Sequence, residues 1–377
     1  MDFQHTKEHL FVQKMAKSFA DKYLRPIAAQ IDEEHRFPSE NVEKMAEYGL
    51  MSIPFPKEYG GAGGDYTTYA IVIEELARAC ATTAVVCAAH TLATWPIYHF
   101  GNEGQRQKYL PELLSGRQLA AFALTEPNAG TDAARQQTQA VEDGDYWVLN
   151  GTKTFITNGG YADVFLLMAM TDKSKGNHGI TAFIVKKDDP GFSVGKTDIK
   201  MGVCGSSMTD LTLHNCRIPK DRVLGQLGQG FKIAMAALDG GRIGIAAQAI
   251  GLAQEAFDDT VNFLNARKQF GKPLSKMQAL QFEMANMATQ IEAARLLMYK
   301  AADMKNRGEN FTKNASMAKL FASETAMYVT TKCVQFHGGY GYTKEFPIER
   351  MMRDAKVTEI YEGTSEVQKM VIAAHVL

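Results

Sequence analysis

The hydrophobic pattern of this chain changes its period twice, and the resulting order of segments constrains the fold more than any single motif. In the first ~120 residues, apolar positions such as Phe11, Met15 and Phe19 recur every four residues, which is typical of amphipathic helices. From about Leu119 to Ile218 the apolar runs have strand length and are separated by Gly, Asn, Asp and Pro. Helical spacing returns after Gly230, so the order is helices, strands, helices.

The helical regions can be divided further. In the N-terminal region the pattern predicts helices over 41–50, 66–79 and 103–114, and a helix within the uncharged run 79–102. That run contains two histidines, four threonines and Pro96, which favours a buried helix over a membrane span. In the C-terminal region, two segments with long apolar stripes are predicted to be helices that pack with two later helices in a four-helix bundle. The four predicted helices are 246–264, 280–298, 313–336 and 365–376.

The middle segment is predicted to be a compact antiparallel β-domain. Tyr146–Leu149 and Lys153–Thr157 flank Asn150-Gly151, a pair that is typical of a hairpin turn. The fold class is therefore α+β, with an N-terminal helical domain, a central antiparallel β-domain and a C-terminal four-helix bundle. The expected boundaries of the three domains are 1–120, 121–226 and 227–377.

Several function classes are disfavoured by what the sequence lacks. Strands do not alternate with helices, so a Rossmann sheet or a β/α barrel is not expected, and no phosphate-loop, zinc-protease or serine-hydrolase motif occurs. The 41 basic and 42 acidic residues give a net charge of −1, without the excess of positive charge expected for nucleic-acid binding. The five cysteines form no CxxC pair, so no metal site is expected and the thiols are read as reduced. The N-terminus, Met1 to His5, lacks a signal peptide, so a cytoplasmic protein without membrane attachment is expected.

Five short segments have residue types that suit binding or catalysis. They are 124–132, 155–160, 267–271, 335–341 and 360–365. The first offers backbone N–H groups to an anionic or heteroaromatic ligand. Arg267 could bind a phosphate just before Gly271, which is expected to end a helix. The glycines of 338–341 allow close approach of a flat group. Glu362 lies between an aromatic residue and a glycine, where burial would raise its pKa toward the range useful for a base. Taken singly, each segment fits an ordinary loop, turn or helix cap at least as well.

In this order, however, the segments resemble the acyl-CoA dehydrogenase family from end to end. The matching pieces are Thr125-Glu126-Pro127 with Ala129 to Asp132, Ile156 to Gly159, Arg267 with Gln269-Phe270-Gly271, His337 to Gly341, and Tyr361 to Thr364. The stretch Leu238 to Gly244 is most similar to the short-chain, butyryl-CoA type. The family's fold has the same three domains that the periodicity predicts.

The resemblance implies an FAD-dependent oxidoreductase of fatty acid metabolism that converts a short-chain acyl-CoA to the trans-2-enoyl-CoA, or crotonyl-CoA in reverse. Glu362 matches the family's base, which removes the Cα proton while the flavin N5 accepts a hydride from Cβ. The Glu362 N–H and a flavin ribityl hydroxyl would donate to the thioester oxygen. Two subgroups of the family place the base on another helix, at the position of Gly241, which has no side chain here.

The resemblance also assigns binding residues one by one. Those expected at the FAD are Phe122, Leu124, Thr125, Gly130, Thr131, Phe155, Ile156, Thr157, Arg267, Gln269, Phe270, Gln278, Gln335, Phe336, Gly338, Gly339, Thr364 and Glu366. Those expected at the acyl-CoA are Thr131, Leu238, Asp239, Arg242, Tyr361 and Gly363. Arg267 and the residues of 335–339 would reach the FAD of a neighbouring subunit, which implies a homo-oligomer, usually a tetramer.

Further expectations concern partners and specificity. Electrons would be exchanged with electron-transferring flavoprotein; an acyl-CoA oxidase or related flavoenzyme on the same fold, and a non-catalytic acyl-CoA-binding scaffold, are the alternatives. The helix around 86–95 would form the floor of the acyl pocket, with Trp95 limiting chain length. Cys204 stands where many relatives carry Arg, and a lone Cys without a His motif is not expected to be catalytic.

Overall fold

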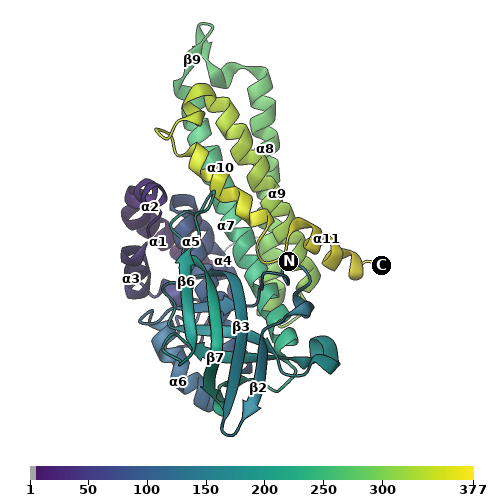
Figure 1. The fold of residues 1–377 in the computed structure, drawn as a ribbon. Coiled ribbons are helices and arrows are strands. Elements are labelled where there is room, and N and C mark those ends of the chain that lie inside the picture. Colours follow the sequence, from purple (N-terminus) through teal and green to yellow (C-terminus); the bar gives the residue numbers. More distant parts are fainter. Residues whose placement is uncertain (1–5) are drawn as a thin grey trace.

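The computed structural model describes residues 6–377, so Met1 to His5, on which the expected lack of a signal peptide rests, lie outside the described residues. Helices precede and follow a β-domain, as the periodicity predicts (Figure 1). The helices are α1 Lys7–Phe19, α2 Ala28–Glu34, α3 Ser39–Glu47, α4 Tyr66–Ala79, α5 Ala81–Phe100, α6 Glu103–Leu114, α7 Gly230–Ala266, α8 Gln278–Asn306, α9 Thr312–His337, α10 Ile348–Lys356 and α11 Ser365–Ala374. The strands are β1 Ala120–Ala123, β2 Gln139–Asp143, β3 Tyr146–Thr157, β4 Val164–Met170, β5 Ile180–Lys186, β6 Phe192–Thr197, β7 Met208–Pro219, β8 Val223–Leu224, β9 Lys268–Gln269 and β10 Lys272–Pro273.

Local signals fix the limits of several N-terminal helices. Asp65 caps α4 by accepting from the Thr68 N–H at 2.7 Å, and Asn102 and Gln105 form a reciprocal capping box at the start of α6. Helix α5 coincides with the uncharged run and is buried along most of its length, which confirms the expectation of a core helix. Its His90 joins three elements, because Nε2 meets the Leu113 carbonyl at 3.1 Å and Nδ1 accepts from the Ala120 N–H at 3.1 Å.

The β-domain is one sheet in the order β6-β7-β3-β2-β4-β5-β8, with β1 attached to β4. It is mixed rather than purely antiparallel, since β1 runs parallel to β4 and β2 meets the end of β4 in parallel register. The even-numbered side chains of β4 pack toward the helices, and Phe165, Leu167 and Ala169 face the interior of the curved sheet. Because both faces of β4 are buried, this strand reads as a continuous apolar run.

The expected hairpin at Asn150-Gly151 is wrong. Strand β3 runs through these residues without turning, and the hairpin lies earlier, where β2 and β3 are joined at Gly144 (φ +57°). Gly151 instead occupies a bulge opposite β7, where a Cβ would lie 2.4 Å from Thr138 Oγ1. An Asn-Gly pair is thus accounted for by a bulge and a close backbone approach, which the dipeptide alone does not distinguish from a turn.

The C-terminal helices form an elongated bundle that projects beyond the rest of the molecule (Figure 1). Helices α7, α8 and α9 are its long members, and α10, which the periodicity did not predict, lies against α9 before the chain reaches α11. Helix α7 is long and apolar enough to pass a length-and-composition test for a membrane span, but 72% of the tested window is buried within the fold. Core helices pass the same test, so the result is weak evidence for a span.

Candidate active site

The segment that carries Glu362 has an unusual backbone. Glu362 has φ +52° and Gly363 has φ +93°, so two consecutive residues occupy the left-handed region just before α11. The Gly363 carbonyl accepts from Lys319 Nζ of α9 at 2.7 Å and from Gln368 Nε2 of α11 at 2.8 Å. Thr364 then caps α11 through the Val367 N–H at 3.4 Å. The segment is therefore held from both helices in a conformation that a non-glycine residue adopts only at a cost.

The carboxyl group of Glu362 is placed as a base would need to be. Its Oε2 atom is buried and has no hydrogen-bond partner among the described residues. Burial raises the pKa of Glu362 to about 7, against the opposing effects of Lys319 and Arg242, whose positive charges favour the ionised form. A carboxyl with a pKa near 7 is present in both protonation states around neutral pH, so it can accept a proton and release it again.

Gly241 of α7 faces this carboxyl directly. A Cβ at Gly241 would lie 2.1 Å from Glu362 Oε2 and 3.0 Å from Leu92 Cδ1 of α5. Position 241 and the end of the Glu362 side chain therefore compete for one place, and any side chain at 241 would displace the carboxylate. An acidic side chain can occupy this place from one of the two positions but not from both, and in this chain it comes from position 362.

The expected acyl-CoA residues of α7 form a charged cluster next to this point. Arg242 donates to Asp239 Oδ1 at 2.6 Å, and Asp239 Oδ2 accepts from Thr312 Oγ1 at 2.6 Å. The Nε atom of Arg242 is buried without a partner among the described residues, so the guanidinium retains a donor for a ligand. Leu238 is half-buried one residue before Asp239, and the hydroxyl of Tyr361 is hydrogen-bonded to Gln248 of the same helix.

The α5 residue closest to the Gly241 position is Leu92, which is 8% exposed. Trp95, the expected floor of an acyl pocket, lies one turn further along α5, where it stacks on His99 at 4.6 Å between ring centroids. Lys305 of α8 holds its ammonium 4.1 Å from the Trp95 ring and 4.2 Å from that of Tyr66. The contacts therefore put Leu92, rather than Trp95, next to Glu362.

A buried ion pair fixes the loop that follows β1, and sequence reasoning missed it. Lys153 of β3 has no exposed surface and donates to Glu126 Oε1 at 2.8 Å, to the Leu124 carbonyl at 2.9 Å and to Gln136 Oε1 at 2.9 Å. Glu126 in turn accepts from the backbone N–H groups of Gln137 and Thr138 at 2.5 and 3.1 Å. The loop 124–138 is thus held to the sheet by one lysine. The sequence analysis singled out the loop motif that contains Glu126, but nothing in the sequence marked Lys153, 27 residues later, as its partner.

The neighbouring section of β3 presents an aromatic ring to solvent. Phe155 has φ +58° at a register shift against β7, and its side chain is 61% exposed. Ile156 is 2% exposed and belongs to the core of the sheet, so only its backbone is available to a ligand. Asn158 in the following turn donates to the Val86 carbonyl of α5 at 3.0 Å and fixes the turn to the N-terminal helices. The exposed ring on a fixed turn suits stacking against a flat heteroaromatic group.

The remaining residues expected near this ring occupy the same region of the chain. Phe122 and Thr125 are half-buried, Leu124 is buried, and Gly130 and Thr131 are exposed at the end of the loop. Thr157 is half-buried at the end of β3, and the Thr125 carbonyl accepts from the Thr154 N–H at 2.9 Å, which ties the loop to the strand. A Cβ at Gly130 would meet nothing within 4 Å, so the loop backbone is open to a ligand.

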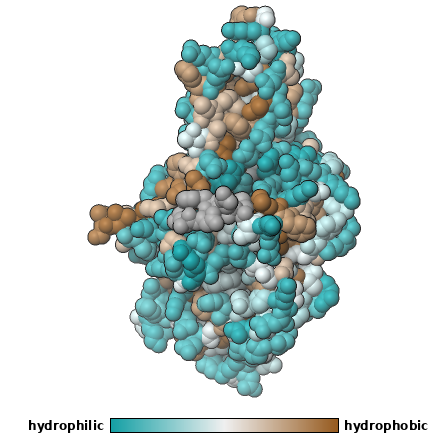
Figure 2. Space-filling view, turned by 180° about the vertical axis from the view of Figure 1, so that it is seen from behind, coloured by the Kyte–Doolittle hydropathy of each residue, from teal (hydrophilic) through white to brown (hydrophobic). Residues whose placement is uncertain are grey.

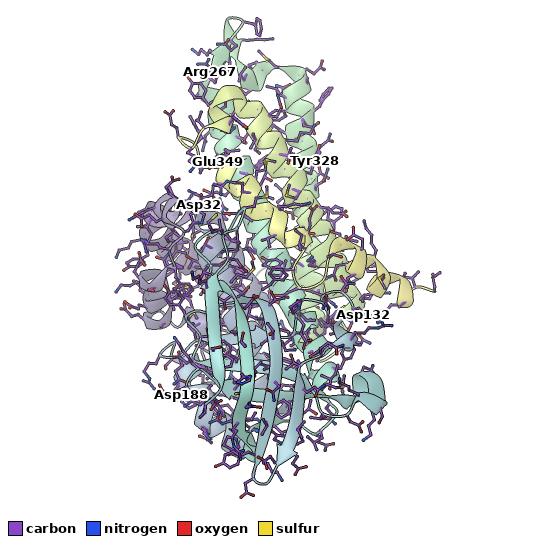
Figure 3. The ribbon with its side chains drawn as sticks, viewed as in Figure 1. Asp32, Asp132, Asp188, Arg267, Tyr328 and Glu349 are labelled. Carbon is purple, nitrogen blue, oxygen red and sulfur yellow. The ribbon has the colours of Figure 1, made fainter. Side chains whose placement is uncertain are left out.

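A second group of expected cofactor residues lies elsewhere. Helix α7 ends at Ala266, and β9 and β10 form a two-stranded hairpin whose turn holds Phe270 and Gly271 with φ +53° and +75°. Gly271 therefore belongs to a hairpin turn. The expectation that it ends a helix is wrong, because α7 already ends at Ala266. The hairpin lies at the free end of the bundle, and Figure 3 shows Arg267 far from Asp132, which lies in the loop after β1. One chain does not bring the two groups of residues together.

Residues at the free end of the bundle are available to a partner. Phe270 is 91% exposed and Phe282 of α8 is 62% exposed, and hydrophobic areas are visible on the bundle from behind (Figure 2). Arg267 lies 5.6 Å above the Tyr340 ring in the turn after α9, where a Cβ at Gly338 or Gly339 would meet nothing within 4 Å. Gln269, Gln278 and Gln335 are also exposed and Phe336 is half-buried, whereas Glu366 lies exposed on α11, near Glu362 in sequence.

Cys204 is a buried free thiol with a hydrogen bond, which agrees with a structural role. Its Sγ donates to the Lys200 carbonyl at 3.4 Å, and burial raises its pKa to about 12, so the thiol stays protonated. The guanidinium of Arg353 of α10 lies 3.7 Å from Cys204 Sγ while it binds Asp32 and Glu349. The positive charge of Arg353 from α10 therefore lies beside position 204, where the family resemblance leads one to expect Arg.

Comparison with known proteins assigns the family. Models of the acyl-CoA dehydrogenase N-terminal, middle and C-terminal domains match residues 6–117, 121–216 and 228–377. The chain is 55% identical to a short-chain specific acyl-CoA dehydrogenase of Clostridium acetobutylicum over the full length of both proteins. It matches the solved butyryl-CoA dehydrogenase of Megasphaera elsdenii with a TM-score of 0.98 and 48% identity, covering all of both chains. A chain from a structure described as the electron transferring flavoprotein of Acidaminococcus fermentans matches with a TM-score of 0.99 and 50% identity, again over both full lengths.

The buried ion pair generates a stability prediction. Lys153→Met should destabilise the protein by about 3–5 kcal/mol, because Glu126 would remain buried without its cation. The double variant Lys153→Met/Glu126→Gln should recover a large fraction of this loss. Urea unfolding followed by tryptophan fluorescence measures both effects. Equal destabilisation in the single and the double variant would show that the pair is not the source of the stability.

Proposed function

The chain belongs to the acyl-CoA dehydrogenase family of FAD-dependent oxidoreductases, and from this premise we propose that it interconverts short-chain acyl-CoA and trans-2-enoyl-CoA with Glu362 as the base. The observation that carries the proposal is the buried, unpartnered Glu362 Oε2 facing Gly241. The names of the relatives from Clostridium acetobutylicum and Megasphaera elsdenii support a short-chain substrate of the butyryl-CoA type.

In the direction of oxidation, Glu362 acts in its ionised form. The carboxylate accepts the proton from Cα of the thioester, and the positive charges of Arg242 and Lys319 partly offset its burial. The thioester oxygen gains negative charge as the proton leaves, and the Glu362 backbone N–H donates to it, an interaction of the kind whose loss costs about 2.7–4 kcal/mol. The bound FAD supplies the acceptor for the hydride from Cβ. In the reverse direction the protonated Glu362 returns the proton to Cα.

The acyl-CoA is proposed to extend from Glu362 along α7. Asp239 and Arg242 would orient the CoA portion, with the free Nε donor of Arg242 directed to the ligand. Leu238, Tyr361 and Gly363 would line the thioester region, and Thr131 would meet the CoA from the β1 loop. Leu92 would limit the space for the acyl tail, since it contacts the Gly241 position beside the base.

The residues present fit an FAD that is shared between subunits. From one chain, the exposed Phe155 ring would hold the isoalloxazine and the open backbone at Gly130 would hold the pyrophosphate. The other expected residues of 122–131 and 155–157, together with Thr364 and Glu366, would complete this part of the site. Arg267, the rest of the hairpin, Gln278 and residues 335–339 would complete the site of a neighbouring subunit, because they lie far from the β1 loop of their own chain (Figure 3). This supports a homo-oligomer, and we propose a tetramer.

Electron-transferring flavoprotein is proposed as the electron partner. The support is the full-length match to a chain from a structure described as that flavoprotein, in work toward a mechanism of electron bifurcation. We also propose a cytoplasmic site of action, since all five cysteines are free and buried, as in proteins of reducing compartments. The three units are proposed to divide at 1–120, 121–226 and 227–377.

The base assignment is tested by Glu362→Gln. The amide fills the same volume but accepts no proton, so kcat with butyryl-CoA should fall at least 10²–10⁴-fold while flavin absorbance is kept. In the parent, kcat should rise as the pH increases through about 7, because the ionised carboxylate is the active form. Glu359→Gln, three residues earlier, is the matched control and should remain active. A Glu362→Gln enzyme with most of its rate would refute the assignment.

The shared cofactor site is tested by Arg267→Ala. Loss of a charged hydrogen bond to pyrophosphate, about 1.5–3 kcal/mol, should lower FAD retention and loosen the oligomer together. Gel filtration with detection at a flavin wavelength measures both, and Lys268→Ala controls for the loss of an adjacent positive charge. An Arg267→Ala protein with full flavin content and unchanged oligomeric state would contradict the assignment.

The floor of the acyl pocket is tested with two variants. Each additional buried CH₂ contributes about 0.8 kcal/mol to binding where there is room, so Leu92→Ala should shift the kcat/KM optimum from butyryl-CoA toward longer chains. Trp95→Ala should change the profile less, because Trp95 packs against His99 and Lys305. A larger shift in Trp95→Ala than in Leu92→Ala would return the floor to Trp95.

A further inference from the structure

Lys319 is a buried cation directed at the segment that carries the proposed base. It lies in the N-terminal third of α9, its side chain has no exposed surface, and its Nζ donates to the Gly363 carbonyl at 2.7 Å. Fully buried lysines are rare in proteins unless they are paired. Burial lowers the pKa of Lys319 to about 8, so the ammonium form still predominates at neutral pH. A cation maintained in this position at the cost of desolvation calls for a functional reason.

We propose that Lys319 is a positioning residue for Glu362: its ammonium fixes the left-handed Glu362–Gly363 segment through the Gly363 carbonyl, and its charge favours the ionised carboxylate. This inference rests on the proposed role of Glu362 as the base. Lys319 would touch neither substrate nor cofactor, and would act through the residue beside its hydrogen-bond acceptor.

The hydrogen bonds around the segment support the positioning role. The Gly363 carbonyl accepts from both Lys319 and Gln368, and the Glu362 carbonyl accepts from Gln368 Nε2 at 3.2 Å. These bonds orient the two peptide groups that follow Glu362 and Gly363. Because Glu362 is not a glycine, its left-handed backbone needs such external support. Gln368 contributes a neutral donor and Lys319 a charged one, so the two roles can be separated by mutation.

The surrounding charges support the electrostatic role. The groups that face Glu362 are Lys319 from α9, Arg242 from α7, Tyr69 from α4 and Tyr361 of its own segment. Of the two cations, Arg242 is already paired with the Asp239 carboxylate at 2.6 Å. The hydrogen-bond acceptor of Lys319 is a neutral carbonyl, so its positive charge remains largely uncompensated. Lys319 is therefore the cation whose removal should affect Glu362 most.

Other ionisable groups act on Lys319 and belong to the same balance. Arg242 disfavours its ammonium form, whereas Glu362, Glu359 and Glu366 favour it. Glu359 is bound to Lys356, and Glu366 is exposed on α11, so water and this pairing weaken their effect. The strongest attraction on the Lys319 charge comes from Glu362 itself, which is the coupling that the proposal requires.

The test compares Lys319→Met with Gln368→Met in the FAD-containing enzyme. Methionine preserves the buried volume, so Lys319→Met removes charge and hydrogen bond together, whereas Gln368→Met removes hydrogen bonds alone. In Lys319→Met the pH at which kcat rises should increase by about one unit or more, because loss of a nearby cation raises the pKa of a carboxyl group. Gln368→Met should lower kcat without moving the pH profile. Lys319→Arg, which keeps the positive charge, should retain most of the parent kcat that Lys319→Met loses. Lys332→Met, on the exposed side of the same helix, controls for loss of charge.

A second measurement does not depend on turnover. The infrared carbonyl band of protonated Glu362, identified by its absence in Glu362→Gln, should persist to higher pH in Lys319→Met than in the parent. An unchanged midpoint in both the infrared titration and the rate profile of Lys319→Met would overturn the inference. So would an equal shift in Gln368→Met or in Lys332→Met. An active Glu362→Gln enzyme would instead overturn the proposed function, so the two failures are distinguishable.

Discussion

The site depends on the placement of one carboxylate, buried and without a hydrogen-bond partner among the described residues, against a glycine of a core helix. Burying a charge in this way is costly, and most proteins avoid it by pairing the group or leaving it neutral. Here the cost is limited because Glu362 titrates near neutral pH and two cations from different helices favour its ionised form. Gly241 leaves room for the carboxyl oxygen, and Gly363 provides the backbone freedom that brings it there. The proposed reactivity of the carboxyl group rests on the same burial that makes its ionised form unfavourable.

The three units of the fold contribute to this point in different ways. Helices α7 and α9 supply the glycine and the cations, α5 supplies Leu92 as an apolar wall, and the chain between α10 and α11 supplies the proposed base. The β-domain is tied to this arrangement by few but specific contacts: Asn158 binds the α5 backbone, and His90 of α5 bonds to the start of β1. Because Lys153 fixes the β1 loop from within the sheet, the exposed end of the loop, at Gly130 and Thr131, is presented from a fixed position.

The sequence predicted the order of the elements well because long amphipathic helices and buried strands leave strong periodic signals. It was wrong where two structures share one local signal: Asn150-Gly151 marks a bulge in β3, and Gly271 marks a hairpin turn rather than a helix end. The short helix α10 was not predicted, although Ile348, Met351 and Ala355 recur at helical spacing and are buried. The proposed base was singled out from its neighbours and from the resemblance, whereas the partners that tune it could not be. Lys319 and Leu92 lie 43 and 270 residues from Glu362 in the sequence, and Lys153, which fixes the β1 loop, lies 27 residues from Glu126. No local pattern encodes contacts between residues so far apart.

The distribution of site residues has a consequence for assembly. The exposed Phe155 ring and the open β1 loop face solvent in a single chain, and so does the hairpin with Phe270 at the free end of the bundle. Exposed aromatic side chains at projecting ends favour association, because their burial removes large apolar areas from water. A monomer would offer each group of proposed binding residues only a portion of its ligand, whereas the proposed oligomer, with the hairpin of one chain against the β1 loop of another, would complete both sites. Cofactor binding and subunit association would then stabilise each other by mass action, so that the enzyme that holds its flavin is also the enzyme that is assembled.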